Sequence, residues 1–163
     1  MPAPVRLILR KTPEDVLAVS FSDEVACQQL LSILTPIPRP NYTIWLTQIE
    51  QIHRFVYQVP DLAWELMDYA TEPLSLVYQR AKPMFSGQLA SEEICIRLLS
   101  EVSLLKELPG QQCWLTTTTA ELPDEFPIKN WIEKEVDMSR IMKGVRPVKK
   151  LRVYDNGEFS FLP

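Results

Sequence analysis

Apolar residues recur along the chain in short runs separated by prolines and polar breaks, and their spacing alternates between the period of strands and that of helices. Strand-like runs lie at Val5–Leu9, Val16–Phe21, Tyr42–Leu46, Pro73–Tyr78, Ile94–Leu98 and Gln112–Thr117. Helical spacing predicts helices after Asp23, over Gln48–Tyr57, from Pro60 through Tyr69, over Glu101–Leu108 and over Ile128–Val136. Because strands and helices interleave throughout, we expect one α/β domain.

Polar residues and prolines mark the ends of the first expected helix. Ser22 or Asp23 can cap its start, because a short polar side chain there accepts a hydrogen bond from the first turn. Pro36 stops this helix, and Pro36, Pro38 and Pro40 together predict an extended loop.

Two later helices carry similar signals. Thr47 and Glu50 have the spacing of a capping box and predict the start of the helix Gln48–Tyr57. Ser100 is placed to cap the helix Glu101–Leu108.

The end of the chain has the strongest local signal. Asn156-Gly157 lies between two alternating segments, Lys150–Tyr154 and Glu158–Leu162. Such a pair between alternating segments predicts a β-hairpin.

Length and composition suit a single compact unit. The chain has 163 residues, of which 46% are hydrophobic and 23% charged, so we expect one domain over residues 1–163. Its apolar runs are too short to cross a bilayer and its start lacks the pattern of a signal peptide, so we expect a cytoplasmic protein without a membrane partner.

Charge and residue usage exclude several kinds of site. A net charge of -4 argues against a surface that grips nucleic acid everywhere. The chain has four glycines against fourteen prolines and can form none of the glycine-rich phosphate loops. Cys27, Cys95 and Cys113 are far apart and His53 is the single histidine, so no metal site is expected and the thiols are expected in the core.

One marked run of basic residues lies near the end of the chain. It consists of Lys143, Arg146, Lys149 and Lys150, followed by Arg152. Such a run can contact the phosphates of double-stranded RNA or tRNA, or it can form an ordinary solvated face.

The order of elements from Thr47 to Ala120 resembles that of the YrdC-like threonylcarbamoyl-AMP synthase family. Residues 72–77 (EPLSLV), 94–98 (ICIRL) and 114–119 (WLTTTT) stand where that family has PGPLTLIL, VRIP and TSAN. The resemblance covers roughly residues 12 to 160 and implies a twisted mixed sheet with flanking helices and a concave, positive face. It also implies a role in tRNA modification, because the family makes threonylcarbamoyl adenylate from threonine, bicarbonate and ATP.

The same resemblance implies nucleotide-binding residues. Arg97 stands at the arginine of VRIP, Thr117 at the serine of TSAN and Thr119 at its asparagine. Arg39 stands at the arginine of the KxR motif, whose lysine is replaced by Ile37. Concentrated positive charge on phosphate oxygens drives adenylyl chemistry, so the loss of that lysine predicts a protein that does not make the adenylate.

Structural interpretations stand beside these assignments. Arg97 can instead pair with Glu92 or Glu93, and the threonines can simply end a strand. His53 is expected at the surface or packed on its helix. The four tryptophans, Trp45, Trp64, Trp114 and Trp131, are expected in the core.

Three functional hypotheses follow. The first is a diverged YrdC-like protein that binds a nucleotide such as ATP, a double-stranded RNA, or a protein of the tRNA-modification pathway. The second is a nucleotidyl or acyl transferase with a phosphate site rebuilt around Arg39, Arg97 and Thr117. The third is an interaction module without a ligand, for which an exposed apolar patch would be the sign.

Overall fold

The computed structural model describes residues 4–11, 14–34, 41–69, 73–85, 93–108, 112–138 and 148–162. Its strands are β1 (Arg6–Arg10), β2 (Val16–Ser20), β3 (Thr43–Leu46), β4 (Leu74–Tyr78), β5 (Ile94–Leu98), β6 (Trp114–Thr118), β7 (Lys134–Asp137), β8 (Lys149–Val153) and β9 (Phe159–Leu162). They form one sheet in the order β7-β1-β2-β6-β3-β5-β4-β8-β9. The sheet is mixed, because β1/β7, β3/β5 and β4/β8 pair in parallel while the other neighbours are antiparallel. The expected α/β fold is thus confirmed.

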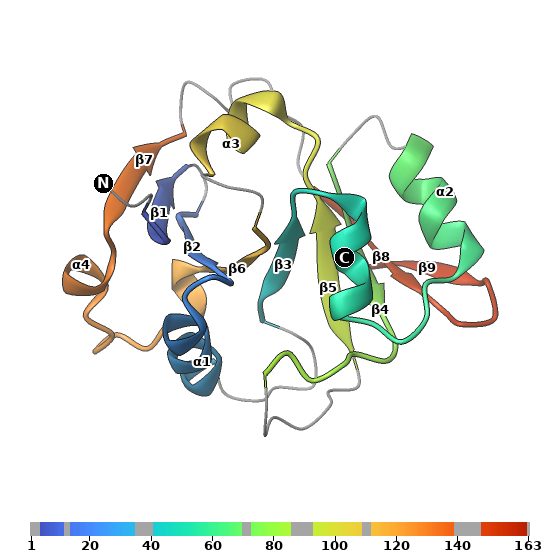
Figure 1. The fold of residues 1–163 in the computed structure, drawn as a ribbon, viewed down its shortest axis with the longest axis horizontal. Coiled ribbons are helices and arrows are strands. Elements are labelled where there is room, and N and C mark those ends of the chain that lie inside the picture. The colour runs from blue at the N-terminus through green and yellow to red at the C-terminus, as the bar shows by residue number, and fades with distance from the viewer. Residues whose placement is uncertain are drawn as a thin grey trace.

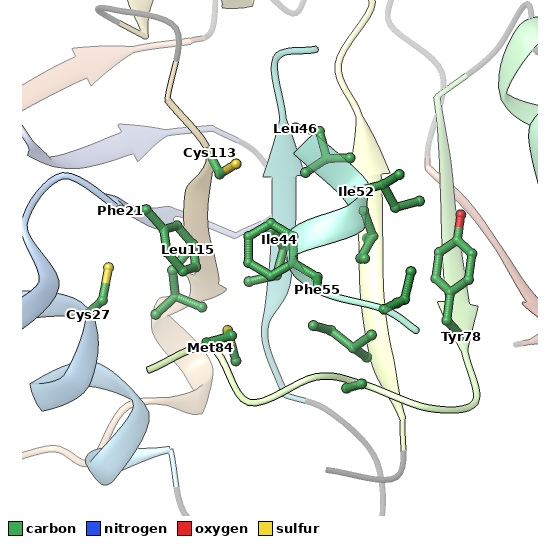
Figure 2. Packing of buried hydrophobic residues seen from close by; sticks show 14 of the residues in the cluster. Phe21, Cys27, Ile44, Leu46, Ile52, Phe55, Tyr78, Met84, Cys113 and Leu115 are labelled. Carbon is green, nitrogen blue, oxygen red and sulfur yellow. The ribbon is translucent and has the colours of Figure 1, made fainter. Parts of the chain in front are cut away.

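Helices lie on both faces of this sheet, and most of them cover one face. The helices are α1 (Glu24–Ile33), η1 (Ile49–Arg54), α2 (Asp61–Tyr69), α3 (Val102–Glu107), η2 (Thr119–Glu121) and α4 (Ile128–Trp131), where η marks a 3-10 helix. Figure 1 shows η1 in front of β3 and β5, with α1 and α2 to either side. In the core beneath η1, Phe55 packs edge-on against Phe21 with ring centroids 5.2 Å apart (Figure 2).

Side-chain alternation gives the sheet two different faces. On β3, Ile44 and Leu46 point into the core beneath η1, whereas Thr43 and Trp45 belong to the opposite face. On that opposite face, Leu104 of α3 packs in a second, smaller apolar cluster with Trp45 and Trp114. We call the face beneath η1 the covered face and the opposite one the open face.

The C-terminal hairpin is confirmed. Gly157 donates a backbone hydrogen bond to Tyr154 (2.9 Å), and Tyr154 donates one to Glu158 (2.9 Å), so residues 155–157 form the loop. Gly157 has a φ of 90°, a conformation that strains any residue with a Cβ. This explains the glycine at that position.

The expected helix Ile128–Val136 is wrong in its second half. The helix α4 ends at Trp131, and the chain then enters β7, which pairs in parallel with β1. Val136 is buried in this strand beside Leu9, its partner across the ladder. Pairing with a strand from the other end of the chain outweighs the local helical pattern.

Two expected helix starts also differ. Residues 49–54 form a 3-10 helix, and the Gln51 side chain, not Glu50, accepts hydrogen bonds from the backbone of Thr47 (2.9 Å) and Gln48 (3.1 Å). The amide side chain thus satisfies the donors that a capping box would satisfy. Helix α3 has Glu101 as its N-cap residue in place of Ser100, which shortens it by one residue at its start.

Other expectations about side chains hold in the described residues. All three cysteines are free and buried. Trp45 and Trp114 are buried, and Trp64 and Trp131 pack partly buried against the core. None of the described helices is long and apolar enough to cross a membrane.

Candidate functional site

A cavity of about 350 Å³ lies on the open face of the sheet, beside the part that α3 covers. Its lining comes from distant parts of the sequence and includes Lys11, Trp45, Ser75, Arg97, Thr118 and Lys150. This size lies at the lower end of the range of small-molecule sites, which typically runs from about 300 to 1,000 Å³.

Strand register places four of these residues in one row across the sheet. Trp45 on β3 is paired with Arg97 on β5, Arg97 with Ser75 on β4, and Ser75 with Lys150 on β8. Residues in register on neighbouring strands project from the same face. The row therefore forms the floor of the cavity with two cations, a hydroxyl and an aromatic ring.

Arg97 is the most deeply placed charge of the site. It is only 4% exposed, and its Nη2 donates a hydrogen bond to Oε1 of Glu101 at the start of α3. Its guanidinium carbon lies 5.6 Å from the ring centroid of Trp45. Burial lowers the pKa of Arg97, and the charge of Glu101 opposes that effect. The side chain is thus a cation held in position by a carboxylate and an indole.

Three buried polar atoms on this side of the sheet have no hydrogen-bond partner in the described part of the chain. They are Nε of Arg97, Oε2 of Glu101 and Nε1 of Trp114. Leaving a buried donor unpaired costs about 1–3 kcal/mol, so native proteins seldom retain one without a reason. The Nε of Arg97 is therefore a buried donor without a partner in the described part of the chain, on a side chain that lines the cavity.

The threonines at the end of β6 line the cavity, and two of their hydroxyls also make hydrogen bonds within the protein. Thr116, Thr117 and Thr118 all line it. The hydroxyl of Thr117 donates to the carbonyl of Asn41 (2.8 Å), and that of Thr116 donates to the carbonyl of Thr43 (2.7 Å). Thr117 thus holds the loop before β3 in place, and Thr116 holds the first residue of β3. The oxygen of each hydroxyl can still accept a hydrogen bond.

The structure brings some of the predicted site residues together and separates others. Arg97, Thr117 and Lys150 line the same cavity. Thr119 lies in η2 and is not among the described lining residues, and its backbone donates to the carbonyl of Asp15 (3.0 Å). Lys149 precedes Lys150 on β8 and shares its face with Leu151, which belongs to the covered side. Arg39, Lys143 and Arg146 lie outside the described residues.

The partners of Arg97 differ from those expected. Glu93 pairs with Arg152, through bonds of 2.6 and 3.2 Å, while Arg97 pairs with Glu101. Distance along the strand explains the difference, because Glu93 lies just before the start of β5, about four residues from Arg97, and Glu101 follows the end of β5, beside Arg97. Arg97 is still the residue that the sequence singled out.

Two residues of the site were missed by the sequence analysis. Lys11 directly follows β1 and lines the cavity, and Glu101 lies four residues after Arg97. Neither has a motif around it. The one available signal was the spacing of Arg97 and Glu101 across the end of β5. Among the described residues, no group of His, Cys, Asp or Glu is arranged to hold a metal ion.

Comparison with solved structures identifies the fold. The chain matches YciO of E. coli at a TM-score of 0.57, with 14% identity over 98% of this chain and 82% of that one. It matches P. abyssi Sua5 complexed with L-threonine at a TM-score of 0.54, with 16% identity. That match covers 90% of this chain and 47% of Sua5. It matches full-length HypF, in a phosphate- and nucleotide-bound form, at a TM-score of 0.59, with 12% identity. That match covers 97% of this chain and 26% of HypF. The chain therefore has the YrdC-like fold.

The chain resembles these proteins in its structure, and comparisons of its sequence alone find no match. No family model and no curated protein sequence matches the chain. The chain spans about half the length of Sua5 and about a quarter of HypF.

Proposed function

We propose that this domain binds a nucleotide or a closely related phosphate-bearing ligand in the cavity around Arg97, without making threonylcarbamoyl adenylate, and that it is related to tRNA threonylcarbamoyladenosine modification. The observation that carries the proposal is the buried Arg97, whose Nε has no partner in the described part of the chain and whose side chain lines a cavity of about 350 Å³.

The chemistry of the lining suits a phosphate attached to a base. Arg97 and Lys150 can neutralise phosphate oxygens, and charge-assisted hydrogen bonds from such groups are about twice as strong as neutral ones. Trp45 and the threonines of β6 can contact the remainder of the ligand. One structural neighbour, HypF, is known in a phosphate- and nucleotide-bound form, which supports the assignment of ligand class.

Catalysis is not part of the proposal. Ile37 occupies the position where the resemblance expects a second phosphate-binding cation. Losing such a group typically costs orders of magnitude in the rate of phosphoryl and adenylyl transfer. A binding role is therefore better supported than the transferase alternative.

The test is calorimetric titration of the purified protein with ATP, AMP and adenosine. We expect ATP and AMP to bind and adenosine to bind more weakly, because it lacks the phosphate. Lys150→Glu is expected to weaken AMP binding at least tenfold. Lys149→Glu is the matched control, since it makes the same charge change one residue away on the opposite face. Equal loss in both variants would contradict the proposed cavity.

A second assay distinguishes the binding role from the transferase alternative. It measures whether the purified protein forms threonylcarbamoyl adenylate from ATP, threonine and bicarbonate. We expect no product above the blank. Product formation at a rate above the blank would show that the site is catalytic and would favour the transferase.

Duplex RNA is a second candidate ligand, favoured by the two adjacent exposed lysines of β8, Lys149 and Lys150. Binding of this kind releases counterions and weakens steeply with salt. We expect weak RNA binding that disappears in moderate salt and depends on Lys150 more than on Lys149, because Lys150 faces the cavity. RNA binding that is insensitive to salt would exclude these lysines as its basis.

A further inference from the structure

We propose that the phosphoryl group binds between Lys11 and Arg97, so that Lys11 supplies a further cation of the oxyanion site, in addition to Arg97 and Lys150. This inference rests on the proposed function and assigns a role to a residue that no motif marks. Lys11 lies at the end of β1, and Arg97 lies on β5 in the middle of the sheet. Both line the same cavity.

The charge of Arg97 is already balanced within the protein. Glu101 forms an ion pair with its guanidinium, so Arg97 by itself offers little net charge to an incoming anion. What Arg97 retains is a directed donor, the unpaired Nε. With the charge of Arg97 balanced, Lys150 alone does not match the two charges of a dianionic phosphate, and a further cation is needed.

Lys11 has the properties of that cation. Its side chain is half-buried, and its ammonium group makes no ion pair in the described part of the chain. The neighbouring carboxylate, Asp15, is occupied elsewhere. One oxygen of Asp15 accepts from the backbone N–H of Lys11 (3.2 Å), and the other binds Arg10 (2.6 Å). Asp15 is thus not available to the ammonium group of Lys11 at the cavity wall.

The electrostatic environment supports the same placement. Burial lowers the pKa of Lys11, the positive charge of Arg97 lowers it further, and the nearby Glu14 opposes both effects. Lys150 and Glu121 are the other charged residues lining the described cavity besides Arg97. Two cations that repel each other across a cavity are stabilised by an anion placed between them.

The proposal predicts a proton linked to binding. An anion beside Lys11 raises the pKa of its ammonium, so AMP affinity is expected to fall as pH rises above neutrality towards 10.5, the ordinary pKa of a lysine. The phosphate of AMP stays dianionic over that range, because its second pKa lies near 6. The pH dependence therefore reports on the protein.

Three variants test the role of Lys11 by titration with AMP at several pH values. We expect Lys11→Gln to bind about tenfold more weakly at pH 8 and to depend less on pH than the wild type. Lys11→Arg should retain the affinity and show the same reduced pH dependence, because a guanidinium does not titrate in this range. Lys129→Gln is the control, since it makes the same change at an exposed lysine of α4 that does not line the described cavity.

The outcomes separate this inference from the proposed function. If wild-type protein binds no AMP, the proposed function fails and this inference fails with it. If wild type binds AMP and Lys11→Gln binds equally well with the same pH dependence, the role of Lys11 alone is overturned. Unchanged melting temperatures of the variants without ligand would show that the effects are not those of unfolding. Lys11→Met serves as a second neutral variant should Lys11→Gln be unstable.

Discussion

On β3, neighbouring residues serve opposite purposes: Ile44 is fully buried in the core beneath η1, while Thr43 and Trp45 face a cavity on the open side. The covered face is apolar over its central strands and is overlaid by η1, α1 and α2 (Figure 1). The open face is covered only in part, by the short helix α3, and it carries Arg97, Ser75 and Lys150 where the covered face carries leucine and isoleucine. Stability therefore resides mainly in one face, and the capacity to bind a ligand in the other.

The largest effect is expected from truncating a side chain of the covered face. Phe55 is fully buried and contacts Phe21, so Phe55→Ala should lower the free energy of unfolding by about 3–5 kcal/mol, as measured by urea denaturation. Thr43→Val on the open face is the counterpart and should cost about 1 kcal/mol or less. Equal costs for the two variants would remove the distinction between the faces.

The ion pair of the open face should have an intermediate effect. Arg97→Met leaves the carboxylate of Glu101 without its partner and should cost about 1–3 kcal/mol. Replacing both residues, by Arg97→Met with Glu101→Leu, should recover much of that loss, because an apolar pair can substitute for a buried ion pair. The measurement is a double-mutant cycle by urea denaturation, and strict additivity would show that the two residues do not interact.

Alkaline pH should lower the free energy of unfolding through the buried thiols that pack against the covered face. Burial raises the pKa of the Cys27 thiol from 9.0 to about 12 and that of Cys113 to about 11. The folded protein thus holds these protons more tightly than the unfolded one, so their contribution is complete below pH 9 and falls as pH rises further. The expected slope is about 1.4 kcal/mol per pH unit for each thiol. Cys27→Ala should reduce the slope of stability against pH, and an unchanged slope would contradict the assignment.

A smaller effect is expected where α1 begins. The Asp23 side chain accepts a hydrogen bond from the backbone of Ala26 (3.1 Å) and pairs with Arg6 (3.2 Å). Asp23→Ala should destabilise the protein by about 1 kcal/mol. Asp23→Asn keeps the cap and removes the charge, so it should cost less when both are compared by thermal unfolding. The reverse order would assign the effect to the ion pair.

Most strands were predictable because their own residues carry a strand pattern. The runs that form β2, β4 and β5 are apolar and β-branched, and Gly157 marks the hairpin. The strand β7 was not predictable. Its residues are charged apart from Val136, and only pairing with β1 from the start of the chain makes them a strand.

The site was predictable only where a motif surrounds it. Arg97 and Thr117 were found through the resemblance of their runs to the VRIP and TSAN motifs of the YrdC-like family. Lys11 carries no signal, because its role arises from the arrangement of β1 relative to β5, which the sequence pattern does not specify. The separation of Lys149 and Lys150 onto different faces follows from strand alternation once β8 is known.

The strand order also determines how the chain must fold. β1 completes its pairing only when residue 134 has returned to residue 7, and β8 pairs with β4 across a long stretch of intervening chain. Closing such loops lowers the conformational entropy of the chain before the strand contacts that stabilise the closed loop have formed. Sheets dominated by non-local pairs therefore fold in milliseconds to seconds, slower than helical proteins of similar size. Until β7 and β8 have docked, both flanks of the central strands present unpaired backbone, and during that interval the chain is most exposed to association with other unfolded copies.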